Sequence, residues 1–117
     1  MTTPTTAIRA LEALPHLVRC AQKHQTITYG ELAKKMRIPN PRTLAWPLWF
    51  IRDDICLKRG FPMINAIVVS KSTGLPGKGF LPPGESNLKG EAYRRRFEEV
   101  RDEVFEYAGW DRLLKRQ

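Results

Sequence analysis

The fold of this chain is decided by residues 28–44, TYGELAKKMRIPNPRTL, which predict two helices joined by a tight turn. Thr28 and Glu31 have the spacing of a capping box, in which each side chain bonds the backbone N–H of the other residue. Asn40 is a favoured N-cap, and Pro41 suits the first position of a helix. We therefore expect a short helix, a turn and a second helix in succession.

The second helix should be long and should bury one face. Gly60 is expected to end it just after Arg59. Pro47 lies well inside it, where a missing N–H and a bulky ring should kink or break the helix. Apolar residues repeat along it at helical spacing and are expected to be core, namely Leu44, Leu48, Ile51, Ile55 and Cys56.

The flanking segments extend this pattern. Apolar spacing predicts a helix over residues 5–24, kinked or restarted at Pro15, and residues 25–28 are β-prone. Residues 64–70 are the best strand candidate. A Gly-rich loop follows, and Phe80-Leu81 is expected to return as a second strand that completes a hairpin.

The C-terminal part is expected to be helical. An apolar stripe predicts a helix over residues 87–108, ended by Gly109, and Trp110, Leu113 and Leu114 should dock a final turn. The order of elements predicts one domain over residues 1–117, of the α+β class and mostly helical. Its expected architecture is a winged helix-turn-helix with a β-hairpin wing and flanking N- and C-terminal helices.

Charge points to a polyanionic partner. The chain has 117 residues and a formal net charge of +8. Residues 1–60 hold ten Lys and Arg against four Asp and Glu, a net charge of +6. A basic surface of this kind favours nucleic acid or an anionic membrane face.

The chain shows neither a membrane-spanning run nor a signal peptide, so no membrane partner is expected. Cys20 and Cys56 lie in apolar segments and are interpreted as buried thiols in a reducing compartment, which predicts a cytoplasmic location. His16 and His24 have no visible partner and are interpreted as surface or satisfied side chains rather than ligands.

In a winged helix-turn-helix, the second helix presents its first residues to a DNA groove and the wing contacts the backbone. Here that helix begins with Arg42 and Thr43, and Trp46 follows one turn later, although Trp46 fits the core equally well. Phosphate contacts are expected from four lysines, Lys34, Lys35, Lys71 and Lys78. Double-stranded DNA is therefore the expected partner.

The same region resembles a known family. The resemblance lies in the order and spacing of Thr28-Tyr29-Gly30-Glu31-Leu32-Ala33, Pro41-Arg42-Thr43-Leu44-Ala45, Phe61-Pro62-Met63-Ile64 and Val68-Val69 before the Gly-rich loop. These motifs, within residues 26–80, are similar to the DNA-binding domain of the O6-alkylguanine-DNA alkyltransferases and the alkyltransferase-like proteins. The resemblance implies minor-groove binding and extrusion of a base. It matches Arg42 to the family's intercalating arginine, and Tyr29 to the tyrosine that presses on the target nucleotide's phosphate.

The resemblance stops at the reactive motif. The family's acceptor sequence Pro-Cys-His-Arg stands directly before the paired valines, where this chain has Ile64-Asn65-Ala66-Ile67. Asn65 fits a turn into the strand better than the wall of a pocket. Cys56 lies in the preceding helix, with no base beside it to activate a thiol. We therefore expect a non-enzymatic protein without metal or cofactor; a metal-dependent nuclease is the enzyme class left open.

A second function stays open beside DNA binding. The Gly-rich loop also resembles the wing of small winged-helix proteins of bacteria and their phages. The alternative is a protein-interaction module of phage or mobile-element origin that acts on a host protein. Its docking patch would consist of Trp46, Trp49, Phe50 and Trp110.

Overall fold

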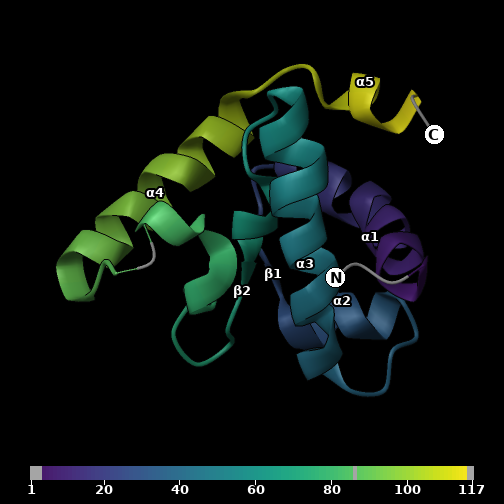
Figure 1. The fold of residues 1–117 in the computed structure, drawn as a ribbon, viewed down its shortest axis with the longest axis horizontal. Coiled ribbons are helices and arrows are strands. Elements are labelled where there is room, and N and C mark those ends of the chain that lie inside the picture. The colour runs from purple at the N-terminus through teal and green to yellow at the C-terminus, as the bar shows by residue number, and fades with distance from the viewer. Residues whose placement is uncertain (1–3, 86, 116–117) are drawn as a thin grey trace.

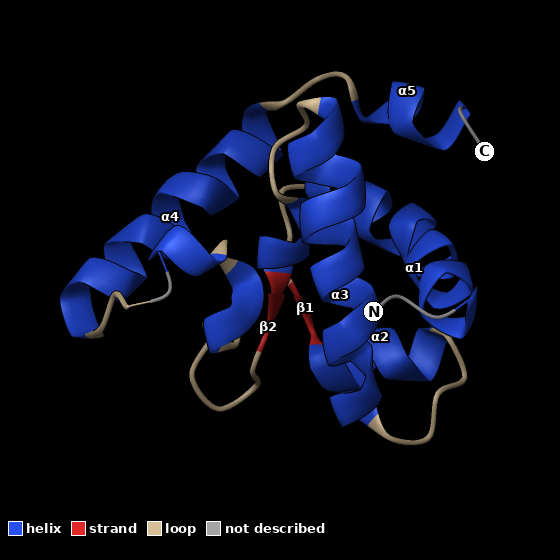
Figure 2. Ribbon diagram, in the orientation of Figure 1, coloured by secondary structure: helices blue, strands red, loops and turns tan. Residues whose placement is uncertain are grey.

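The computed structural model describes residues 4–85 and 87–115. Its helices include α1 (Pro4–Gln22), α2 (Tyr29–Lys35), α3 (Ala45–Phe50), α4 (Gly90–Glu106) and α5 (Trp110–Lys115), and its strands are β1 (Ile27–Thr28) and β2 (Val68–Val69). The α+β, mostly helical class is thereby confirmed (Figure 2). The helical segment that contains α3 stands at the centre of the molecule, with α1 and α4 on either side of it (Figure 1).

Both predicted helix starts are present. The N–H of Glu31 donates to Thr28 Oγ1, and the N–H of Thr28 donates to Glu31 Oε1, each at 3.0 Å. At the second start, Asn40 Oδ1 accepts from the N–H of Arg42 at 3.1 Å, and Pro41 is the first helical residue. These caps satisfy backbone donors that helix ends leave without intrahelical partners.

The second helix changes its winding along its length. It begins as a 3₁₀ turn (Pro41–Leu44), continues as α3 and widens into a π-helix (Ile51–Leu57). Because α-helical winding starts only at Ala45, Pro47 lies in the first turn of α3, directly after the 3₁₀ turn. α3 runs through Pro47, so the break predicted there is absent, and the winding changes instead at Ala45 and at Ile51. The predicted core residues are all buried, namely Leu44, Leu48, Ile51, Ile55 and Cys56.

The two strands form a parallel pair, with Ile27 opposite Val68. The strand predicted over residues 64–70 is confirmed only for Val68 and Val69, because residues 64–67 form a 3₁₀ turn. Both valines are buried. Burial on both faces is typical of parallel strands.

The predicted return strand Phe80-Leu81, and with it the β-hairpin wing, is wrong. The chain reverses earlier than expected, because the N–H of Ser70 donates to the carbonyl of Leu75 at 2.9 Å and Gly74 between them adopts a φ of +71°. Phe80 therefore reaches the body of the protein in a short 3₁₀ turn, with its ring buried in the core.

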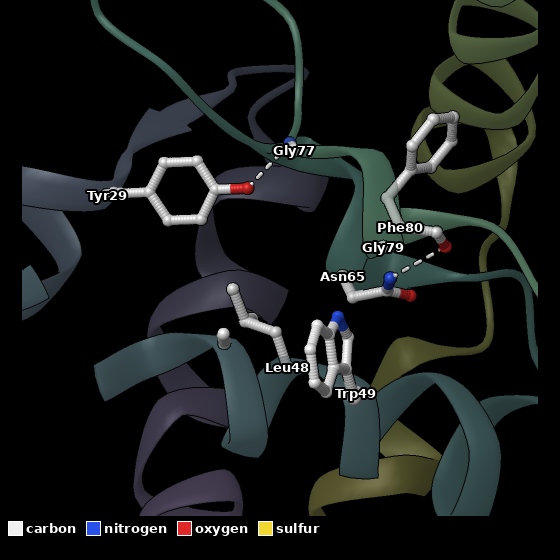
Figure 3. A pocket seen from close by; sticks show the side chains of 8 residues that line it. Tyr29, Leu48, Trp49, Asn65, Gly77, Gly79 and Phe80 are labelled. Atoms are coloured by element: carbon white, nitrogen blue, oxygen red, sulfur yellow. Dashed lines mark hydrogen bonds between the residues drawn. The ribbon is translucent and has the colours of Figure 1, made fainter. Parts of the chain in front are cut away.

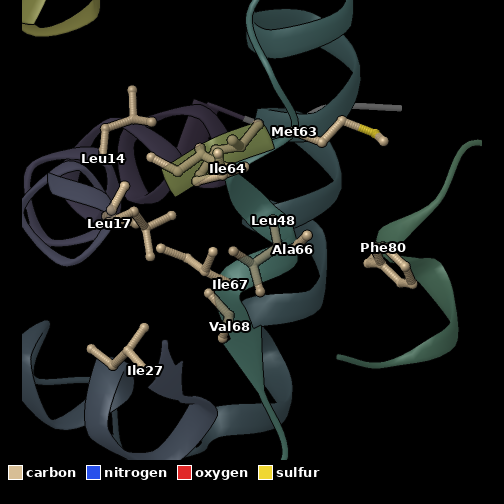
Figure 4. Packing of buried hydrophobic residues seen from close by; sticks show 14 of the residues in the cluster. Leu14, Leu17, Ile27, Leu48, Met63, Ile64, Ala66, Ile67, Val68 and Phe80 are labelled. Carbon is tan, nitrogen blue, oxygen red and sulfur yellow. The ribbon is translucent and has the colours of Figure 1, made fainter. Parts of the chain in front are cut away.

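The core fills the space between α1, the α3 segment and β2. Leu14 and Leu17 of α1 face Ile64 and Ile67, and Leu48 of α3 lies beyond them (Figure 4). All five side chains are buried. The turn before β2 is thus the centre of the packing, which fixes the position of the chain on either side of it.

The C-terminal turn docks as predicted. Trp110 and Leu113 are buried, and Leu114 packs against the same cluster. The indole N–H of Trp110 donates to the carbonyl of Val104 at 2.9 Å, so its polar group is satisfied. Because Trp110 is only 1% exposed, the expectation that it belongs to an exposed docking patch is wrong.

No helix within residues 4–85 and 87–115 combines the length and the apolar character that crossing a membrane requires. Cys20 and Cys56 are free thiols. Cys56 is buried as predicted, whereas Cys20 is partly exposed. The α1 helix runs through Pro15, whose ring lies on its exposed side.

Candidate functional site

A pocket of about 300 Å³ opens between the start of α2, α3 and the chain on both sides of β2. Tyr29 enters from one side and Asn65 from the other, with Leu48 and Trp49 below them (Figure 3). Its lining consists of Tyr29, Ala45, Leu48, Trp49, Asn65, Gly77, Gly79 and Phe80. We call it the Asn65 pocket. Aromatic walls with a few polar groups are typical of small-molecule sites.

Tyr29 is positioned by the capping box directly before it and by the loop above it. Its hydroxyl oxygen accepts from the N–H of Gly77 at 2.8 Å (Figure 3). The hydroxyl keeps its own hydrogen for donation. Burial raises the pKa of Tyr29, so the phenol stays protonated at neutral pH. The half-buried ring is a wall of the pocket, whereas the sequence suggested a phosphate contact.

Asn65 provides an unpaired polar atom in this pocket. The side chain is only 3% exposed, and its Nδ2 donates to the carbonyl of Phe80 at 3.1 Å. Its Oδ1 is sealed from solvent and has no hydrogen-bond partner in the described part of the chain. A buried acceptor without a donor is costly and calls for an explanation. Asn65 lies in the 3₁₀ turn (Ile64–Ile67) that leads into β2, as the sequence predicts, and its side chain also lines the pocket.

Arg52, in the π-helix, holds the far wall of the pocket. Its Nη1 donates to the carbonyl of Gly79 at 2.6 Å and to that of Leu81 at 3.1 Å. Its Nε and Nη2 each donate to the carboxylate of Asp53 at 2.7 Å. The ion pair lowers the pKa of Asp53. The guanidinium therefore ties the α3 segment to the loop that closes the pocket, a role that the sequence pattern does not indicate.

Gly79 is needed for the close approach between this loop and Trp49. A Cβ at Gly79 would overlap the indole of Trp49, whereas a Cβ at Gly84 would meet nothing within 4 Å. We expect Gly79→Ala to displace the indole and to cost about 1–3 kcal/mol of unfolding free energy. Urea denaturation and tryptophan emission measure both effects.

Gly84→Ala is the matched control for this substitution and should leave stability and emission unchanged. If Gly79→Ala were as stable as Gly84→Ala and kept the native emission spectrum, the packing of Trp49 against the loop would be refuted.

The residues predicted for a DNA groove lie together on the outside of the second helix. Arg42 and Thr43 are exposed in its first turn. Trp46 is 61% exposed, so it is not a core residue. Its ring meets that of Trp49 edge to face, with centroids 5.1 Å apart. The exposed face Arg42-Thr43-Trp46 is thus linked through Trp49 to the Asn65 pocket.

The lysines predicted for phosphate contacts are exposed at Lys34, Lys35 and Lys71. The pKa of the Glu31 carboxyl is lowered, mainly because it accepts a hydrogen bond from the N–H of Thr28. The charges of Lys35 and Lys71 are close enough to lower it further. The side chain of Lys78 lies outside the described part of the structure, which gives only its backbone. Lys35 and Lys71 thus contribute charge to one region of the surface.

The structure offers no activated cysteine at the Asn65 pocket. Burial raises the pKa of Cys56 to about 12, so a thiolate does not form there at neutral pH. Among the described residues, no three His, Cys, Asp or Glu side chains gather as metal ligands would.

The sequence predicts the exposed face and the position of Tyr29 but misses three parts of the pocket. It suggests Trp49 only as a surface aromatic and Asn65 as a turn residue, and it does not point to Arg52. The signal available for Asn65 is a lone polar residue in an otherwise apolar run, residues 63–69.

Comparison with known proteins finds no matching family model, no similar curated protein and no similar solved structure.

Proposed function

We propose that this chain is a non-enzymatic protein that binds double-stranded DNA. In this proposal, α2 and the helix that starts at Pro41 act as a helix-turn-helix unit of the winged-helix type, with the loop of residues 70–79 beside it in place of a hairpin wing. The observation that carries the proposal is the exposed face Arg42-Thr43-Trp46 at the capped start of the second helix. An exposed tryptophan beside an arginine suits insertion into a base stack.

Exposed lysines support a DNA partner. Lys34 and Lys35 are exposed on α2, which packs against the start of the second helix. Lys71 lies in the loop after β2. Point charges at these positions suit backbone phosphates, which position a protein on a duplex without reading its sequence.

The Asn65 pocket gives this proposal a second element. Asn65 stands where the alkyltransferases have their acceptor cysteine, so the site would recognise without reacting, as in alkyltransferase-like proteins. We propose that the pocket accepts a base extruded from the duplex. The ring of that base would lie against Trp49, and the hydroxyl of Tyr29, which keeps its hydrogen for donation, would bond an acceptor of the base.

Fluorescence anisotropy with labelled duplexes tests the proposal. One duplex carries an O6-alkylguanine and its control carries guanine, and each is titrated at two salt concentrations. We expect salt-sensitive binding of both duplexes and tighter binding of the modified one. Equal affinities for the modified and unmodified duplexes would rule out the base-accepting pocket. Absence of binding to either duplex at low salt would rule out the DNA-binding function.

The loop lysine should act through the phosphate backbone. We expect Lys71→Ala to weaken binding of all duplexes alike, and to reduce the slope of log affinity against log salt by about one unit. The matched control is Lys89→Ala, which removes an exposed lysine from the chain just before α4. Identical slopes for Lys71→Ala and the unmodified protein would exclude a phosphate contact at Lys71.

One observation favours the alternative, a protein-interaction module that acts on a host protein. Ile8 and Leu11 of α1 are 56% and 45% exposed, and Trp46 is 61% exposed. An apolar partner surface would cover such side chains. Ile8→Ser separates the two functions, because it should leave DNA binding unchanged and abolish binding to a protein partner.

A further inference from the structure

A second pocket, of about 180 Å³, lies between the C-terminal half of α1, the chain before β1 and the outer face of α2. We call it the His16 pocket. It contains His16, Arg19 and Cys20 of α1, Lys23 beyond the end of α1, and Glu31 and Lys35 of α2. Of its lining residues, only Lys35 is among the expected DNA contacts, and none lines the Asn65 pocket.

The charges of the His16 pocket are strongly unbalanced. Arg19, Lys23 and Lys35 bring three cations to its wall, and Glu31 is the one carboxylate among its described lining residues. One oxygen of Glu31 is already used, because Oε1 accepts from the N–H of Thr28 at 3.0 Å. None of these three cations has an ion pair among the described residues. Such a set of free donors attracts an anion.

His16 adds a group that lacks a partner inside the protein. Its Nδ1 is sealed from solvent without a hydrogen-bond partner in the described part of the chain. Burial lowers the pKa of His16, and the charges of Arg19 and Lys35 lower it further. The imidazole is therefore neutral near pH 7 in the free protein. An anion among these cations would offset their repulsion and favour the protonated ring.

Other chemistry fits this pocket poorly. A metal cation would be repelled by Arg19, Lys23 and Lys35. Cys20 does not supply a thiolate, because burial raises its pKa more than the nearby cations lower it. The geometry and the charge leave an oxyanion as the ligand.

We propose that the His16 pocket binds a phosphate group through Arg19, Lys23 and Lys35, and that His16 takes up a proton when it does. The phosphate belongs either to a nucleic-acid backbone or to a free phosphorylated molecule. The site does not depend on the proposed DNA function, since the pocket is formed by α1 and α2 without the second helix.

Sulfate is the first probe, because its charge stays constant between about pH 5.5 and about pH 7.5. We expect it to shift the His16 ring signals in NMR spectra saturably, and to bind at least about threefold more tightly at about pH 5.5 than at about pH 7.5. His24 is an internal control, because it stacks on Phe105 and is not part of the pocket. Absence of a saturable shift at His16, or an equal shift at His24, would overturn the proposal.

Two adjacent lysines provide matched variants. Lys35→Gln should weaken sulfate binding at least about fivefold, whereas Lys34→Gln removes the same charge outside the pocket and should leave it unchanged. If both variants lost the same affinity for sulfate, general surface charge would explain the binding and the proposed site would be refuted.

A short duplex then separates the two sources of phosphate. If the duplex shifts His16 and sulfate competes with it, the pocket holds a backbone phosphate. If sulfate binds and the duplex does not, the pocket holds a free phosphate, and the DNA function fails while the site stands. If the duplex binds but sulfate does not shift the ring signals of His16, the pocket proposal fails and the DNA function stands.

Discussion

Replacing Arg42 with alanine should weaken duplex binding by several-fold to about a hundredfold, the effect of removing about 1–3 kcal/mol of contact energy. Arg42 is exposed in the first turn of the second helix, and the cap that starts this helix is the side chain of Asn40, so the fold should not change. Arg42→Lys keeps the charge but loses the planar guanidinium and should recover only part of the affinity.

Arg59→Ala is the matched control for Arg42. It removes the same charge from an exposed position at the opposite end of the same helical segment. Anisotropy titrations at one salt concentration compare the three variants with the unmodified protein. An affinity for Arg42→Ala equal to that of Arg59→Ala would eliminate insertion of Arg42 into the groove and leave only general electrostatic attraction.

Replacing Arg52 with methionine should cause a large loss of stability. The side chain of Arg52 is 10% exposed, and its replacement would leave the carbonyls of Gly79 and Leu81 without their donor. Buried groups that lose their partners cost about 1–3 kcal/mol each, so we expect a loss of about 2–4 kcal/mol in urea denaturation. The ion pair with Asp53 adds little, because that carboxylate is 47% exposed.

Asp53→Asn separates the two parts of this interaction. It removes the ion pair and keeps both carbonyl contacts, so it should cost far less than Arg52→Met. Because the pKa of Asp53 is lowered in the folded protein, the small contribution of the pair is present at neutral pH and is lost as pH falls through that lowered pKa. Equal losses for the two variants would mean that the carbonyl contacts do not stabilise the loop.

The features predicted correctly are those that neighbouring residues determine. The capping box at Thr28 and the cap at Asn40 depend on residues two or three positions away, and both are present. The core face of the second helix follows from the spacing of Leu44, Leu48 and Ile51 alone. Local hydrogen bonding and periodicity are therefore sufficient for the helices of this chain.

The errors concern contacts between distant residues. The hairpin is expected because Phe80-Leu81 follows the strand candidate, yet the strand pairs with Ile27–Thr28, which precede α2 and the second helix in the sequence. The sequence does not predict the Arg52–Asp53 ion pair, because adjacent residues on an α-helix are not expected to face one another. In the wider π-helical winding, Arg52 and Asp53 pair through both carboxylate oxygens. Helices of this kind are rare and frequently occur at functional sites.

The role of Asn65 could not be read from its neighbours either. The sequence shows a polar residue within an apolar run, which a turn explains as well as a pocket does. The pocket forms, and the amide of Asn65 is buried, only when Tyr29, Trp49 and Phe80 pack around it. The walls of this site come from separate stretches of the chain.

The parallel pairing of β1 and β2 has a consequence for the order of folding. Ile27 and Val68 are roughly forty positions apart, and closing so long a loop costs entropy that only later contacts repay. The capped helices between them can form first, since their hydrogen bonds are local. Tyr29 follows one strand and Gly77 lies beyond the other, so the two come together only when the strands have met. The Asn65 pocket is thus among the last features that a refolding chain acquires, and partly folded forms with most of their helices would still lack it.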